Sequence, residues 1–123
     1  MTVLVVEDSD VVRERLVKMF HEAIDPVETL EATTPEETIL LLRAQAPQVV
    51  LLDLALRDGN GFEVLDRMKA ESITTPVVVL TNHALPRFRE LCLKAGARYF
   101  FDKSLEFEQA AAAVRQLGRG AEN

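Results

Sequence analysis

Residues 3–12 read VLVVEDSDVV, and this stretch decides how the rest of the chain is interpreted. Residues 3–6 are four consecutive apolar residues, which is typical of a strand that is covered on both faces. Three acidic residues, Glu7, Asp8 and Asp10, follow within the next four positions. Carboxylates so close together repel one another, so the end of this strand predicts a site that receives a positive group.

Composition narrows the class of protein. The 123 residues are 48% hydrophobic and 28% charged, which favours one soluble globular domain. The apolar runs are far shorter than the ~20 residues that span a bilayer, so we expect no membrane insertion, and we expect no signal peptide. A net charge of -6 without a basic stripe argues against direct nucleic-acid binding. The single Cys92 excludes an internal disulfide and fits a reducing cytoplasm, and its apolar neighbours at helical spacing predict core packing.

Short apolar runs alternate with stretches of helical pattern, as in an α/β protein with a parallel sheet. The runs lie at residues 3–6, 27–32, 49–53, 77–80 and 98–101. The second run alternates polar and apolar residues and predicts an edge strand, whereas the first, third and fourth are continuously apolar. With right-handed crossovers, we expect a doubly wound, flavodoxin-like (βα)5 sheet of order 2-1-3-4-5.

Several helix boundaries and faces can be predicted. Thr34, Pro35 and Glu37 form a typical helix start, and Ser9 or Asp10 is expected to cap the first helix. The residues expected on buried faces include Val12, Leu16, Met19 and Ala23 in the first helix, Leu40, Leu41 and Leu42 in the second, and Leu85, Phe88, Leu91 and Ala95 in the fourth. The last helix is expected to end at Gly118 and Gly120.

Side chains that can bind a ligand or take part in catalysis stand at the ends of four of the expected strands. Ligands of open parallel sheets bind outside the carboxyl ends of the strands, where the winding reverses. Glu7 and Asp8 follow the first strand and Asp53 ends the third, so they should be neighbours at that reversal. Thr81 ends the fourth strand and Lys103 follows the fifth, on the same rim. Each residue alone has an ordinary structural explanation, but together they predict one site.

The charges of this rim suggest its ligand. Two carboxylates ~4 Å apart repel by about 4 kcal/mol at an effective dielectric constant of about 20, and one lysine does not offset three carboxylates. Either a carboxylate takes up a proton or a divalent cation binds, and oxygen ligands with room for water suit Mg²⁺, with Mn²⁺ as a substitute. No Cys or His pair has zinc spacing, and no nucleotide-binding glycine motif is present, since Gly59 and Gly61 more simply form a turn into the third helix. Asp53 therefore remains as the candidate nucleophile.

Four stretches carry a resemblance to a known family. They are VEDSD (6–10), LLDLALRDGNGFEVL (51–65), VVVLTN (77–82) and KAGARYFFDKS (94–104). In this order and spacing they resemble the receiver domain of two-component response regulators, of the stand-alone, chemotaxis-regulator type. The resemblance covers residues 2–118.

The resemblance implies a role for each matching residue. Asp53 would accept a phosphoryl group from a phosphohistidine of a sensor histidine kinase or a histidine phosphotransfer protein. Asp8, Asp53 and the backbone carbonyl of Ala55 would bind Mg²⁺, with Glu7 acting through water. Lys103 would pair with the phosphoryl oxygens.

The resemblance also implies a switch. Thr81 would bind the phosphoryl group and draw its loop inward. Phe100 stands at the place of the switch aromatic, although ordinary strand packing explains it equally well. The output would be a changed surface of the fourth helix, fifth strand and fifth helix, presented to a downstream protein partner. His83 and Asn82 flank the acceptor and are expected to modulate the rate of dephosphorylation.

Some positions depart from the common pattern, and other classes remain open. Ser104 stands where a proline is usual, so we expect a trans Lys103–Ser104 peptide bond. A Mg²⁺-dependent phosphohydrolase with an aspartyl nucleophile is one alternative, but Ala55 stands where its second aspartate would lie. An inert interaction module is another. We expect a single receiver domain over residues 1–123 without an output domain, catalysing only its own phosphorylation and slow autodephosphorylation.

Overall fold

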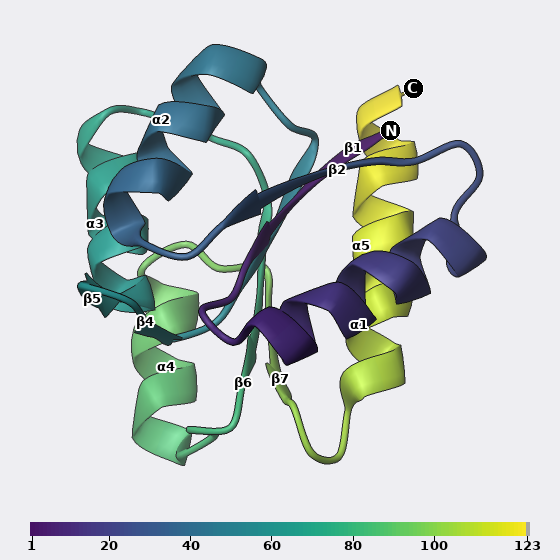
Figure 1. The fold of residues 1–123 in the computed structure, drawn as a ribbon. Helices are drawn as coiled ribbons and strands as arrows, with labels where there is room; N and C mark the ends of the chain where they lie inside the picture. Colours follow the sequence, from purple (N-terminus) through teal and green to yellow (C-terminus); the bar gives the residue numbers. More distant parts are fainter. Residues whose placement is uncertain (123) are drawn as a thin grey trace.

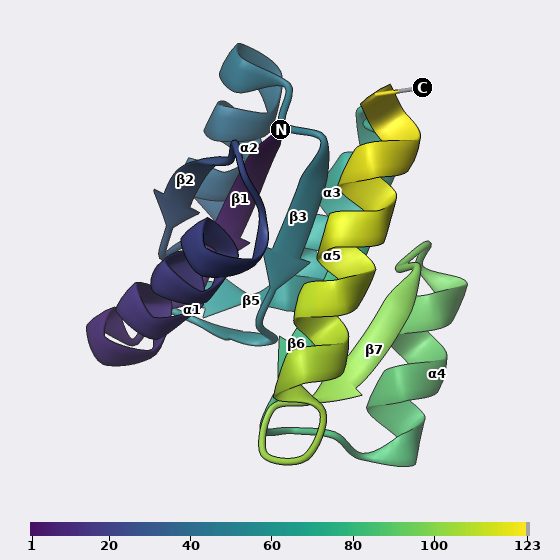
Figure 2. The ribbon, with the colours of Figure 1, turned by 90° about the vertical axis from the view of Figure 1, so that its right-hand side faces the viewer.

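A computed structural model describes residues 1–122 of the chain. Its main sheet has five parallel strands in the order β2-β1-β3-β6-β7, which confirms the predicted order (Figures 1 and 2). The strands are β1 (Thr2–Val6), β2 (Glu28–Ala32), β3 (Val49–Leu52), β6 (Val77–Thr81) and β7 (Tyr99–Asp102). Each lies within one residue of its predicted bounds, because the Val- and Leu-rich runs mark the buried strands directly.

Helices cover both faces of this sheet. They are α1 (Asp10–Ala23), α2 (Pro35–Gln45), α3 (Gly61–Ala70), α4 (Pro86–Lys94) and α5 (Phe107–Glu122). Helices α1 and α5 lie on one face, and α2, α3 and α4 lie on the other (Figures 1 and 2). Because successive strand residues point to opposite faces, Leu4 and Val6 belong to the core under α2–α4, whereas Val3 and Val5 belong to the core under α1 and α5.

The predicted helix starts are present. The Ser9 hydroxyl accepts a hydrogen bond from the backbone N–H of Val12 at 3.3 Å, so Ser9 is the cap of α1. The Thr34 hydroxyl accepts from the backbone N–H of Glu37 at 3.1 Å, and the Glu37 carboxylate reaches back to Thr33. These caps fix where α1 leaves the acidic end of β1 and where α2 begins after β2.

Four residues that were predicted to lie on buried helix faces are exposed, and they belong to α1, α2 and the α4 region. Ala23 is exposed, and Phe20 is the buried residue of that turn. Leu40 is 50% exposed, because successive helical residues differ by about 100° and three consecutive leucines cannot share one face. The buried pair of α2 is Ile39 and Leu42 instead. In α4, Leu85 and Leu91 are exposed, whereas Cys92 is fully buried, as predicted.

The prediction that the last helix ends at Gly118 and Gly120 was wrong. Helix α5 continues past both glycines to Glu122, and a Cβ at Gly118 would lie 2.1 Å from the Met1 side chain. A second feature was not predicted. After β3, two short strands, β4 (Ala55–Leu56) and β5 (Gly59–Asn60), form an antiparallel ribbon that leads into α3. Within residues 1–122, no helix combines the length and the apolar character that crossing a membrane requires.

Candidate functional site

The carboxyl ends of β1, β3 and β6 and the loop after β7 surround a cavity of about 330 Å³. It is lined by Glu7, Asp8, Ser9, Val12, Asp53, Ala55, Asn82, His83 and Lys103. The structure therefore brings together residues from four separate segments that the sequence placed on one rim. Of the residues predicted for the site, Thr81 and Phe100 do not line this cavity.

Lys103 joins two of the carboxylates. Its Nζ lies 2.5 Å from Glu7 Oε1 and 2.8 Å from Asp53 Oδ2. The Lys103, Glu7 and Asp53 side chains are only 11%, 3% and 8% exposed, so both ion pairs are shielded from water. The sequence predicted charge compensation at this site, but not that Lys103 would bridge these two carboxylates.

Burial and charge act together on these groups. Burial raises the pKa of the Glu7 carboxyl above its ordinary value, although hydrogen bonds from Lys103 and from the Ser9 backbone act in the opposite direction. Burial by itself lowers the pKa of Lys103, but the hydrogen bonds and charges of Asp53 and Glu7 outweigh it, so the Lys103 pKa is raised. The site therefore holds a firmly charged ammonium next to a glutamate that takes up a proton more readily than usual.

Asp53 is held by its own backbone. Its Oδ1 accepts hydrogen bonds from the N–H groups of Leu54 at 2.7 Å and Ala55 at 3.4 Å. The start of α3 packs against the same residue, because a Cβ at Gly61 would lie 2.7 Å from the Asp53 carbonyl oxygen. A glycine is needed there for this close approach, and the sequence indicated only that Gly61 enters the helix.

Thr81 and Phe100 lie behind the cavity wall. The Thr81 hydroxyl is fully buried and accepts a hydrogen bond from the His83 backbone N–H at 3.1 Å. Phe100 is 4% exposed and packs in the core under α2–α4, while its carbonyl oxygen accepts from Arg89 Nη1 at 3.1 Å. His83 and Asn82 are exposed at the cavity mouth. The switching and rate-modulating roles of these residues stay predictions.

The loop after β7 carries Lys103 into the site. The Lys103 backbone N–H donates to the Thr81 carbonyl at 3.0 Å, and the Asp102 carboxylate accepts from the Ser104 N–H and hydroxyl at 2.8 and 2.6 Å. The Lys103–Ser104 peptide bond is trans, as predicted. The exposed Ser104 thus takes part in a local turn that orients the lysine.

The donor atoms of this cavity are suited to a hard cation. Asp8, Asp53 and the backbone of Ala55 offer oxygen atoms at one wall, which is the ligand type that Mg²⁺ prefers when water completes its shell. Over residues 1–122, no group of three or more His, Cys, Asp or Glu side chains is arranged to hold a metal ion. A bound cation would therefore depend on backbone oxygen and water as well as on carboxylates.

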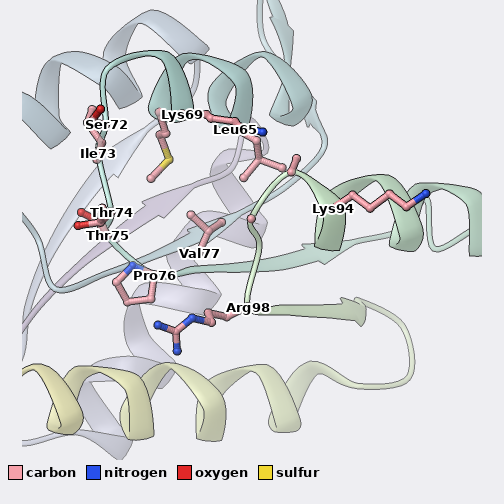
Figure 3. Close-up of a pocket in the computed structure, with 13 residues that line it drawn as sticks. Leu65, Lys69, Ser72, Ile73, Thr74, Thr75, Pro76, Val77, Lys94 and Arg98 are labelled. Carbon is pink, nitrogen blue, oxygen red and sulfur yellow. The ribbon is translucent and has the colours of Figure 1, made fainter.

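A larger cavity, of about 410 Å³, lies at the opposite end of the sheet (Figure 3). It opens between the C-terminal ends of α3 and α4, with Met68 and Val77 among its apolar walls. Lys69 and Arg98 lie at its edge, and its lining contains no carboxylate. None of the predicted site residues lines it, so the smaller, acidic cavity is the candidate site.

Comparisons with known proteins agree with this geometry. Residues 3–115 match the family model of the response regulator receiver domain. The nitrate/nitrite response regulator protein NarL of Escherichia coli K12 is 29% identical over 119 residues, which cover 97% of this chain and 55% of NarL. The transcriptional regulatory protein PhoP of the same strain is also 29% identical over 119 residues, covering 97% of this chain and 52% of PhoP. The chain spans about half the length of these curated relatives.

A solved structure shows the same fold. The receiver domain of the Francisella response regulator 1452 superimposes with a TM-score of 0.88 at 21% sequence identity, and the match covers 97% of each chain. The family model matches most of the sequence, and the sheet order is the one that the sequence predicted. The chain therefore belongs to the receiver domains of two-component response regulators.

Proposed function

We propose that Asp53 is the phosphoacceptor of this receiver domain. The observation that carries the proposal is the position of Asp53 in the acidic cavity, with one carboxylate oxygen bound by Leu54 N–H and the other by the Lys103 ammonium. A carboxylate held in this way has a fixed orientation and a cation ready beside it. Both features suit in-line attack on phosphorus, where positioning and charge neutralisation supply most of the catalysis.

The proposed donor is a phosphohistidine of a sensor histidine kinase or a histidine phosphotransfer protein. An Asp53 carboxylate oxygen forms a bond to phosphorus while the P–N bond breaks. The imidazole ring, which already carries a proton on its other nitrogen, takes the electron pair of the P–N bond and leaves as neutral histidine. Lys103 then balances the added negative charge on the phosphoryl oxygens, since its ammonium already lies 2.8 Å from Asp53. We place the reaction in the cytoplasm, where the buried Cys92 stays reduced.

Asp8, Asp53 and the Ala55 carbonyl would hold Mg²⁺ or Mn²⁺, with Glu7 acting through water. When bound, the cation would supply further neutralisation of the phosphoryl charge. Asp8 is suited to this role because, in the described part of the chain, it forms no ion pair or side-chain hydrogen bond.

The proposed output is a shift between two surface states of α4, β7 and α5. Thr81 would exchange its hydrogen bond from the His83 amide for one to the phosphoryl group, which pulls on the loop that leads into α4. Phe100 belongs to the same core cluster as Cys92 of α4, and Ala84 of that loop packs against this cluster, so the packing of Phe100 would report the change. A downstream protein partner would read the altered surface.

The test is phosphorylation by a small donor. The protein is incubated with acetyl phosphate and Mg²⁺, and intact mass spectrometry should show addition of one phosphoryl group that Asp53→Asn and EDTA both abolish. Asp58→Asn is a matched control on the neighbouring loop and should still be modified. Continuous phosphate release without a lasting adduct would instead indicate a phosphohydrolase, and no modification at all would indicate an inert interaction module.

A further inference from the structure

Arg13 connects three segments beside the acidic cavity. Its Nη1 donates to the Glu7 backbone carbonyl at 2.9 Å, its Nη2 to Asp10 Oδ1 at 2.6 Å, and its Nε to Glu31 Oε1 at 3.0 Å. Glu7 directly follows β1, Asp10 begins α1, and Glu31 belongs to the edge strand β2. The Arg13 side chain is only 15% exposed, so these bonds are partly protected from water.

Of these three contacts, the hydrogen bond to the Glu7 carbonyl is the one that bears on the orientation of Asp8. It belongs to the peptide unit that joins Glu7 to Asp8, so holding its oxygen fixes the plane from which Asp8 projects. The Glu7 backbone N–H is held on the other side by the Ala32 carbonyl at 3.0 Å. Asp8 has no hydrogen bond of its own within the described residues, so its direction depends on this backbone.

We propose that Arg13 is a positioning residue of the acidic site: it holds the Glu7–Asp8 peptide so that the Asp8 carboxylate faces the cavity and keeps its affinity for a divalent cation. This inference rests on the cation of the proposed function. Residues that orient metal ligands without touching the metal typically contribute 10–100-fold to metal affinity. We expect about a tenfold contribution here, because Arg13 acts through the backbone rather than on the ligand itself.

The positioning role of Arg13 and its positive charge predict opposite effects of a neutral substitution on Mg²⁺ affinity. The hydrogen bond with Asp10 raises the pKa of Arg13, so the side chain stays charged, and a fixed positive charge near the site opposes a bound cation. If charge dominated, a neutral residue at position 13 would strengthen Mg²⁺ binding. If positioning dominates, both a neutral residue and a lysine weaken it, because the compact ammonium of lysine cannot reproduce the planar fork that reaches three acceptors.

The experiment is a Mg²⁺ titration of the full chain, in which binding is monitored through the chemical shifts of the backbone amides. Arg13→Lys and Arg13→Gln should each bind Mg²⁺ about tenfold more weakly than the parent. Arg43→Lys is the matched control, because Arg43 binds both oxygens of Glu71 at 2.6 and 2.7 Å but ties α2 to α3, away from the cavity. Its Mg²⁺ affinity should not change. Equal affinity of the parent and Arg13→Lys, or tighter binding by Arg13→Gln, would overturn the proposal.

A second readout needs no metal. In EDTA, the backbone amides of Glu7 and Ser9, which donate to the Ala32 carbonyl and to Glu7 Oε2, should exchange with solvent faster in Arg13→Lys than in Arg43→Lys, because only the former releases the loop. Unchanged exchange at both amides would also overturn the proposal. If neither Arg13 variant folds, Glu31→Ala removes one of the three acceptors from the exposed side and should weaken Mg²⁺ binding several-fold, whereas an unchanged affinity would contradict the role.

Asp8→Asn separates this inference from the proposed function. If Asp8→Asn binds Mg²⁺ as the parent does, the metal site itself is wrong, whatever Arg13 does. If Asp8→Asn loses binding while Arg13→Lys keeps it, the metal site stands and the positioning role of Arg13 is wrong.

Discussion

Removing the ammonium of Lys103 should destabilise the metal-free protein substantially. In Lys103→Met, the nearly isosteric apolar chain leaves Glu7 and Asp53 buried without the cation that now lies 2.5 and 2.8 Å from them. Removing one partner of a buried ion pair typically costs about 3–5 kcal/mol, because the remaining charge stays desolvated. We expect about 3 kcal/mol, near the lower limit, because Glu7 can escape the cost by binding a proton.

The pH dependence follows from that proton. Burial already raises the pKa of Glu7 above the ordinary 4.5, and loss of Lys103 removes the hydrogen bond and the charge of the ammonium that lower it, leaving only the Ser9 backbone hydrogen bond to do so. A carboxyl group with a raised pKa in the folded state favours folding at low pH, and this contribution is lost as the pH rises through the folded-state pKa. The stability difference between the parent and Lys103→Met should therefore be smaller near pH 5 than near pH 8.

Urea unfolding in EDTA measures both effects. Lys94→Met is the control, because Lys94 pairs with Glu90 at 3.0 Å on a surface where both side chains are mostly exposed, and such pairs contribute less than about 1 kcal/mol. The double variant Glu7→Gln/Lys103→Met should recover most of the loss, since it removes one of the two stranded charges. A Lys103→Met protein as stable as Lys94→Met, or a double variant no more stable than Lys103→Met, would refute the reasoning.

Three other predictions concern single residues. Gly61→Ala should lose about 1–3 kcal/mol of unfolding free energy, because its Cβ would lie 2.7 Å from the backbone oxygen of Asp53. The control Gly120→Ala should lose none, because there is open space around Gly120, and equal stability of the two variants in urea unfolding would contradict the prediction. Burial raises the pKa of the Cys92 thiol to about 11. Iodoacetamide at pH 8 should therefore label Cys92 in urea but barely in the native protein, and rapid labelling of the native protein would mean that α4 separates from the core. His83 lies at the mouth of the acidic cavity, so His83→Ala should change the rate at which the phosphorylated protein loses its phosphoryl group. A slower variant would indicate that His83 orients the attacking water, a faster one that it crowds the entrance, and a rate equal to that of the parent would leave His83 as a surface residue.

The sequence predicts the sheet well because burial on both faces leaves continuous apolar runs, such as residues 49–52, that no other element explains. It also predicts which charges gather at the rim, since strand ends of a parallel sheet share one edge. It does not show which charges touch. The bridge from Lys103 to Glu7 spans 96 positions and depends on loop geometry that no local pattern encodes. The three contacts of Arg13 are equally invisible, because an arginine on an amphipathic helix normally indicates only a solvated face.

The bridging ammonium of Lys103 is also a cation that is covalently tethered to the chain and competes with free cations for the Glu7 and Asp53 carboxylates. A free monovalent ion that displaced the ammonium would bring the same single charge. The exchange would break the two hydrogen bonds of Lys103, and the bound ion would lose its freedom of translation. A divalent ion brings twice the charge and leaves the ammonium free to remain nearby as a second partner. We therefore expect sodium and potassium not to displace Lys103 at ordinary ionic strength, so that a cation which binds beside Asp53 would be a divalent one.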